Sequence, residues 1–197
     1  MFLRNFWELI RCGFNLTAIS TPYSGYNVDA TATSIKAVDG TDLAYLLGNI
    51  NTRSGACDNV TVMHAANATW KLFNDFQGVV GTGVTEPDAD DYQLAGDVTS
   101  DFSSTSTSIN VSVDAQGQLS IMMTWTGLNN SGSDLILREF GAVKPLYYYS
   151  SSSMYCQSVS NPNLSPKNAL MIRQLLSDPI TVPAGSSVNI SVEITIK

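Results

Sequence analysis

The residues of this sequence that could carry chemistry gather between Gly78 and Ser100, in the stretch GVVGTGVTEPDADDYQLAGDVTS, where a G-x-G step precedes several carboxylates. Glycine-rich turns can cradle phosphate, and clustered carboxylates can bind hard cations. A P-loop needs a lysine after its glycines, and a dinucleotide fingerprint needs a third glycine that opens a helix. Here Gly83 is followed by Val-Thr-Glu-Pro. The stretch is therefore not a phosphate site.

The carboxylates after the two glycines raise the question of a metal. Asp88, Asp90 and Asp91 offer the oxygen ligands that Ca²⁺ prefers, and Asp97 follows closely. The alternating ligands, central glycine and closing glutamate of an EF-hand are absent. We therefore predict a solvated acidic turn without a metal, with a Ca²⁺ site as the alternative. No feature of the sequence indicates a cofactor.

Catalytic residues are scarce in this chain. Its single histidine, His64, lies in the strand-like segment TVMHAAN, where a lone histidine is more often structural than a general base. Cys12, Cys57 and Cys156 lie far apart without a C-x-x-C motif, so we expect isolated thiols. No carboxylate pair stands out as that of a glycosidase. We predict that the protein is not an enzyme.

Charge and hydropathy limit the classes of partner. The formal net charge is -7 and no cluster of lysine or arginine occurs, so the surface potential repels phosphate. We therefore expect no nucleic-acid partner. No apolar run approaches the ~18 residues of a membrane span, and the apolar N-terminus is interrupted by Glu8 and Arg11. We expect a soluble protein without a membrane partner.

The composition predicts an all-β fold. Charged residues make up only 14% of the chain and hydrophobic residues 44%, and serine and threonine are abundant. Such a mixture favours short strands and polar turns. Apolar and polar residues alternate along residues 108–126, which predicts a β-hairpin with one wet face. Its apolar face consists of Ile109, Val111, Val113, Leu119, Ile121, Met123 and Trp125.

The C-terminal half continues this strand pattern. The run LILREFGAV is almost entirely apolar, which is typical of a central strand covered on both sides. Pro179 and Pro183 cannot donate to a ladder, so their segment is an edge strand or a corner. Alternation returns from Val188 to Ile196. Strands and turns at this spacing predict a β-sandwich, of which the jelly roll is one form.

A short N-terminal helix is predicted by large apolar residues at spacings of three and four, namely Leu3, Phe6, Trp7, Ile10 and Phe14. The predicted opposite face carries Arg4, Glu8 and Arg11. A helix this short is marginal alone and must dock. It either packs on its own domain or reaches a neighbouring subunit. We assign residues 1–20 to this helix or arm and residues 21–197 to the β-sandwich.

A run of tyrosine and serine, KPLYYYSSSSMYC, stands out between Lys144 and Cys156. Tyrosine gives rigid amphipathic contact area and serine gives adaptable hydrogen bonding, which together are typical of binding loops. Tyr147, Tyr148 and Tyr149 are therefore candidate partner-binding residues. In the alternative interpretation, the tyrosines end a strand and the serines form a loop.

Three sequence blocks follow one another in a fixed order: VGTGVTEPDADDYQLAGDVTS, WTGLNNSGSDLILREFGAV and RQLLSDPITVPAGSSVNISVEITI. Together they resemble a family of structural proteins from tailed bacteriophages, especially phages of gut bacteria. In that family a GTG-T-P-DY-L segment precedes a β-sandwich closed by a PITVPAG strand. The resemblance covers residues 79–196 and implies a sandwich in that part of the chain.

The resemblance also implies roles for single residues. In the first block, Gly81 and Gly83 would serve the backbone, and Tyr92 and Leu94 the packing. Glu139 and Gly141 match the family's EVG strand, with Phe140 in place of a small aliphatic residue; the closing block is matched by Arg173, Pro179, Pro183 and Gly185. The family offers no catalytic residues to carry over.

As a function, the resemblance implies a non-enzymatic component of a virion, located at the capsid, neck or tail. Such a protein contacts other virion proteins and forms a homo-oligomer within the particle. The N-terminal stripe and the tyrosine run are the candidate contacts. The alternative is a carbohydrate-binding or receptor-binding module at the virion surface. It would bind host glycan through Tyr147, Tyr148 and Tyr149, with Trp70 or Trp125 as a sugar platform.

Overall fold

The computed structural model describes residues 1–14, 17–20, 26–31, 35–43, 45–47, 76–113, 117–146, 148–149 and 167–196. Its helical elements are α1 (Arg4–Phe14) and the short 3-10 helix η1 (Thr99–Asp101). The strands are β1 (Thr17–Ser20), β2 (Tyr26–Thr31), β3 (Tyr45–Leu47), β4 (Gln77–Gly81), β5 (Phe102–Val113), β6 (Leu119–Asn129), β7 (Leu135–Leu146), β8 (Tyr148–Tyr149), β9 (Lys167–Val182) and β10 (Ser187–Ile196).

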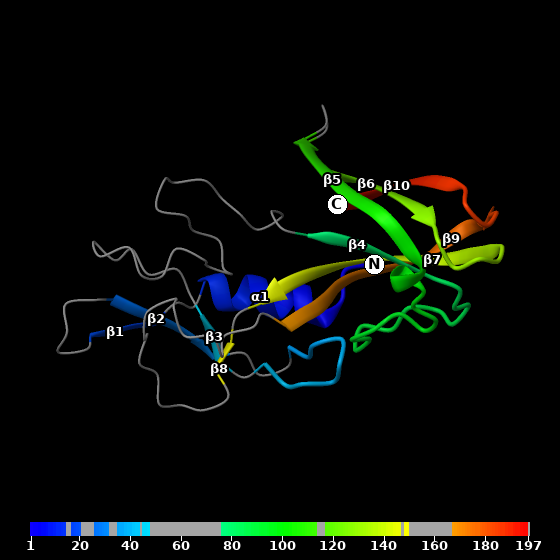
Figure 1. Cartoon of the computed structure of the whole chain (residues 1–197). Helices are drawn as coiled ribbons and strands as arrows, with labels where there is room; N and C mark the ends of the chain where they lie inside the picture. The colour runs from blue at the N-terminus through cyan, green and yellow to red at the C-terminus, as the bar shows by residue number, and fades with distance from the viewer. Residues whose placement is uncertain are drawn as a thin grey trace.

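The strands form antiparallel sheets, and the predicted all-β class is confirmed. Two three-stranded sheets have the orders β10-β6-β5 and β4-β7-β9, and a smaller sheet has the order β1-β2-β3-β8. Figure 1 shows β5, β6 and β10 lying together over the strands β4, β7 and β9. Apolar side chains of both three-stranded sheets join one core cluster, so the two sheets form the layers of the predicted sandwich.

Trp125 lies at the centre of this core. It is fully buried on β6, where Ile121 and Met123 share its face. Its ring packs edge-on against Phe102, with 5.2 Å between the centroids. A Cβ atom added to Gly78 of β4 would lie 2.6 Å from Trp125 Cδ1, so only glycine lets the opposite sheet approach this closely. The predicted register of this strand is confirmed.

The prediction was wrong for the far end of the hairpin. Val111 and Val113 continue the apolar face of β5, but they are 41% and 65% exposed. Figure 1 shows this end of β5 projecting away from β4, β7 and β9. The alternation is therefore real, but the strand runs past the sheet that would cover it.

The sheet β4-β7-β9 is buried on both faces, as the apolar run LILREFGAV predicts. The central strand β7 places Phe140 and Ala142 against the other sheet. On the opposite face, Val143 packs with Leu94 from the loop after β4. Pro179 lies exposed on the edge strand β9, where the pairing with β7 shifts register between Leu137 and Glu139. The predicted edge position of this proline is confirmed.

The helix α1 docks on β9 of its own chain. Leu3 N donates to Met171 O at 2.9 Å, and Arg173 N donates to Met1 O at 3.1 Å, which pairs the first residues with the strand. Leu3 and Phe6 are buried, as is Leu9, which the predicted stripe did not include. For Leu3 and Phe6, the structure favours the interpretation in which the stripe packs on its own domain.

Two other residues of α1 depart from the predicted stripe. Trp7 is 51% exposed, whereas Glu8, assigned to the outer face, is 8% exposed. The pairing of the first residues with β9 sets the rotation of the helix, so that positions three, six and nine point inward. Exposed Trp7 packs edge-on against Phe6, with 5.2 Å between the ring centroids.

Candidate functional site

A buried ion pair lies on the face of the sheet β4-β7-β9 that the loop after β4 covers. Glu139 of β7 is fully buried, and its Oε2 accepts a hydrogen bond from Arg173 Nε at 2.9 Å. Arg173 comes from the neighbouring strand β9, where the register sets it opposite Gly141. Both charged residues belong to blocks that carry the sequence resemblance. Neither the pair nor its burial was predicted.

Glu139 holds both ends of the loop through their backbone amides. Its Oε1 accepts hydrogen bonds from Gly83 N at 3.2 Å and from Gly96 N at 2.8 Å. Its Oε2 also accepts one from Ala95 N at 3.3 Å. Hydrogen bonds to a charged group are stronger than neutral ones, so one buried side chain fixes two segments of loop.

Arg173 holds the middle of the same loop. Its Nη1 donates to Asp91 Oδ2 at 2.5 Å, and its Nη2 donates to Thr85 O at 2.9 Å. Burial alone would lower the pKa of Arg173, but the hydrogen bonds and charges of Asp91 and Glu139 raise it above its ordinary value. The guanidinium therefore stays charged, and it is compensated by two carboxylates within the fold.

The G-x-G step makes room for the glutamate. A Cβ atom added to Gly81 would lie 2.5 Å from Glu139 Oε1, and one added to Gly83 would lie 2.4 Å from the same oxygen. Any larger residue would displace the carboxylate and break its hydrogen bonds with the loop amides. The two glycines thus leave room for a buried carboxylate of the protein.

Substitution of Gly83 with alanine tests this role. We expect the free energy of unfolding to fall by about 1–3 kcal/mol, as when an extra methyl group is forced into a well-packed core. The new methyl group meets both Glu139 Oε1 and Ala95 Cβ. Val84→Ala is the control at the neighbouring, exposed position and should cost less than about 0.5 kcal/mol in urea denaturation. Equal losses for both variants would contradict the role of Gly83.

The acidic turn is tied to cationic side chains. Asp91 Oδ2 accepts from Arg173 and also from Asp88 N at 2.8 Å. Asp90 forms an ion pair with Arg4 of α1, with 2.7 Å between Asp90 Oδ1 and Arg4 Nη1. Asp88 and Asp90 are exposed, and Asp91 is partly buried. The prediction of a solvated acidic turn was therefore wrong for Asp91, because a buried arginine from β9 reaches it.

Chelation tests the prediction that the turn holds no metal. Within the residues that the structure describes, no group of three or more histidine, cysteine, aspartate or glutamate side chains is arranged to hold an ion. We expect EDTA to leave the thermal midpoint unchanged. A drop of several degrees that Ca²⁺ reverses would contradict this prediction and make Asp88, Asp90 and Asp91 ligands.

The predicted partner-binding residues fall into separate environments. Leu3 and Phe6 lie in the core, and Ile10 is partly buried against it. Trp7 is exposed, and Phe14 ends α1 with its side chain outside the described part. Tyr148 and Tyr149 form β8, which pairs with β3, whereas Tyr147 and the side chains of all three tyrosines lie outside the described residues.

The remaining residues singled out in the sequence are Trp125 and several that the structure does not describe. Trp125 is fully buried, so the hypothesis that its ring is a sugar platform was wrong, because a platform must present a ring face to solvent. His64, Trp70, Cys57 and Cys156 lie outside the described residues, as does the side chain of Cys12.

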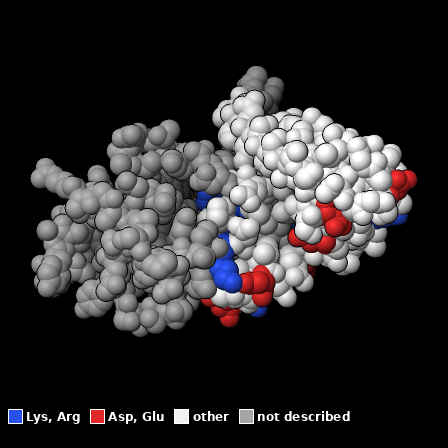
Figure 2. Space-filling model, in the orientation of Figure 1, with Lys and Arg blue, Asp and Glu red and all other residues white. Residues whose placement is uncertain are grey.

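The charged groups of the buried network bind one another and the loop, so the network stabilises the fold. Every acid and base in it is engaged by a protein partner, and the carboxylate of Glu139 is closed off from solvent. On the face drawn in Figure 2, the surface over β5 and β6 is almost free of charged side chains; below it, one acidic patch stands apart from basic side chains and another lies beside them. No protein-family model, curated protein or solved structure matches the chain. Among the described helices, none is long and apolar enough to cross a membrane.

Proposed function

We propose that this protein is a non-enzymatic structural component of a tailed-bacteriophage virion, which acts through contacts between subunits. The observation that carries the proposal is the convergence of the sequence blocks that resemble virion proteins. Gly81 and Gly83 of the first block, Glu139 of the second and Arg173 of the third meet in one buried network. The residues that carry the resemblance therefore stabilise the sandwich, which is what a structural protein requires.

Trp7 is the residue of the N-terminal stripe best placed to contact another subunit. It is half-exposed, and it stands beside Phe2, with 5.9 Å between the ring centroids. Aromatic residues at protein interfaces often dominate the binding energy. Leu3 and Phe6, by contrast, are buried in the core of their own chain, so they are not available to another subunit.

The proposal is tested in particles of a phage that encodes the protein. We expect mass spectrometry of purified particles to detect the chain in a fixed copy number, as symmetric assembly requires. Detection in the infected-cell lysate but not in particles would contradict the proposal. In complementation, Trp7→Ala should reduce incorporation into particles while leaving the melting of the isolated protein unchanged. Val113→Ala, on β5, is the control at another exposed apolar position.

A further inference from the structure

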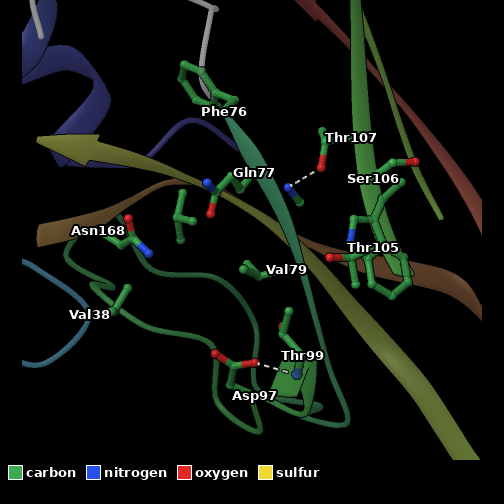
Figure 3. A pocket seen from close by; sticks show the side chains of 13 residues that line it. Val38, Phe76, Gln77, Val79, Asp97, Thr99, Thr105, Ser106, Thr107 and Asn168 are labelled. Carbon is green, nitrogen blue, oxygen red and sulfur yellow. Dashed lines mark hydrogen bonds between the residues drawn. The ribbon is translucent and has the colours of Figure 1, made fainter. Parts of the chain in front are cut away.

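A polar groove lies where the edge strands of the two three-stranded sheets meet. It has a volume of about 520 Å³ and is bordered by β4 on one side and β5 on the other. Figure 3 shows Gln77 and Asn168 on one side and Thr105, Ser106 and Thr107 on the other, with Val79 between them. A groove of this volume is within the range of small-molecule sites. The buried ion pair does not border it.

Several polar side chains at this groove have donors or acceptors that are not paired within the described part of the protein. The side chains of Gln77, Thr105 and Asn168 make no hydrogen bond within the part of the chain that the structure describes. Asp97 Oδ1 accepts from Thr99 N at 2.8 Å, which leaves Oδ2 as an acceptor. Two amides, a carboxylate oxygen and a hydroxyl therefore border one groove as donors and acceptors for a ligand.

One residue that lines the groove carries an unpaired donor. Trp125 contributes to its lining, and the buried Nε1 of this residue has no acceptor among the described residues. Buried donors almost always find a partner, so each exception calls for an explanation. A ligand or water oxygen that reaches this nitrogen would supply the missing acceptor.

The lining selects against several kinds of ligand. It contains no lysine or arginine, and its single charged side chain is Asp97, so anions are repelled. One carboxylate does not make a site for Ca²⁺, which takes six to eight oxygen ligands. Val38, Val79 and Val143 supply apolar surface between the polar groups. A neutral ligand that carries both hydroxyl groups and C–H faces fits this combination.

We propose that the groove binds a neutral carbohydrate of one or two sugar units. Gln77 and Asn168 pair with hydroxyl groups on one side, and Asp97 accepts from another at the end of the groove. The valines contact the C–H face of the ring. This site differs from the tyrosine run and from the tryptophan platforms inferred from the sequence, and it does not depend on the virion role.

The test is a titration of the ¹⁵N-labelled full chain, monitored by NMR, with glucose, galactose, N-acetylglucosamine and maltose. The indole Nε1–H signal of Trp125 is assigned by its loss in Trp125→Phe. We expect at least one of these neutral sugars to shift that signal in a saturable manner. N-acetylneuraminic acid, which carries a carboxylate, and CaCl₂ should not compete for the site.

Variants locate the site. Gln77→Ala and Asn168→Ala should each weaken binding by about tenfold, which corresponds to the loss of about 1.4 kcal/mol. Gln93→Ala and Asn189→Ala, at exposed positions away from the groove, are the matched controls and should bind as the unmodified protein does. The proposal is overturned if no neutral sugar shifts the Trp125 signal, or if both groove variants keep full affinity.

Discussion

Glu139→Gln is expected to lower the free energy of unfolding by about 3–5 kcal/mol, the loss typical of a buried ion pair deprived of one partner. The change preserves the shape of the side chain but removes its charge. Because Arg173 is 1% exposed, water cannot replace the lost carboxylate. Asp91 alone then compensates the guanidinium, from the partly exposed end of the network.

The hydrogen bonds add to this loss. Glu139 accepts on both carboxylate oxygens, from three loop amides and from Arg173 Nε. A glutamine has one acceptor oxygen, so in either orientation its NH₂ group faces a buried donor. The loop should therefore loosen, and hydrogen exchange at Gly83 and Gly96 should accelerate more than exchange in β6.

The matched control is Glu193→Gln. Glu193 lies exposed on β10 and accepts a hydrogen bond from Ser120, so its substitution should change stability by less than about 0.5 kcal/mol. In a double-mutant cycle, Glu139→Gln combined with Arg173→Met should lose less than the sum of the single variants, because neither charge is then left without its partner. Strict additivity would contradict the coupling.

Periodic patterns predicted the sandwich well because they report which face of a strand is buried. Alternation placed Trp125 inside, and an almost entirely apolar run placed β7 at the centre of its sheet. The same patterns failed at Val111 and Val113, since alternation does not tell where the covering layer ends. At Glu8 the pattern failed because the rotation of α1 is set by backbone pairing with β9.

The candidate site was harder to predict because its contacts are distant in the sequence. Asp91 and Arg173 are 82 residues apart, with β5, β6 and β7 between them in the sequence, and no period links the two residues. One signal was nevertheless present in the sequence: Glu139 and Arg173 are opposite charges inside two apolar runs, LILREFGAV and ALMIRQLL. A buried charge is tolerated when it is paired, so two such runs predict a pair between neighbouring strands.

Deletion of Met1–Gly13 is expected to abolish the cooperative melt of the protein. Leu3, Phe6 and Leu9 leave the core together, and truncation of a single such residue costs about 2–5 kcal/mol. The combined loss approaches or exceeds the ~5–15 kcal/mol that stabilises an ordinary domain. The deletion also removes Arg4, the partner of Asp90, and uncovers the part of β9 that pairs with the first residues.

Single substitutions distinguish the loss of core packing from the other effects of removing the whole segment. Leu3→Ala should lose about 2–5 kcal/mol in urea denaturation, whereas Trp7→Ala, one turn further along the exposed side of α1, should lose far less. If the truncated chain keeps its β circular dichroism and melts cooperatively, then α1 is an arm that the sandwich does not need, and docking on a neighbouring subunit becomes its main role. If it unfolds, the helix is part of the domain, and contacts between subunits are left to exposed side chains such as Trp7.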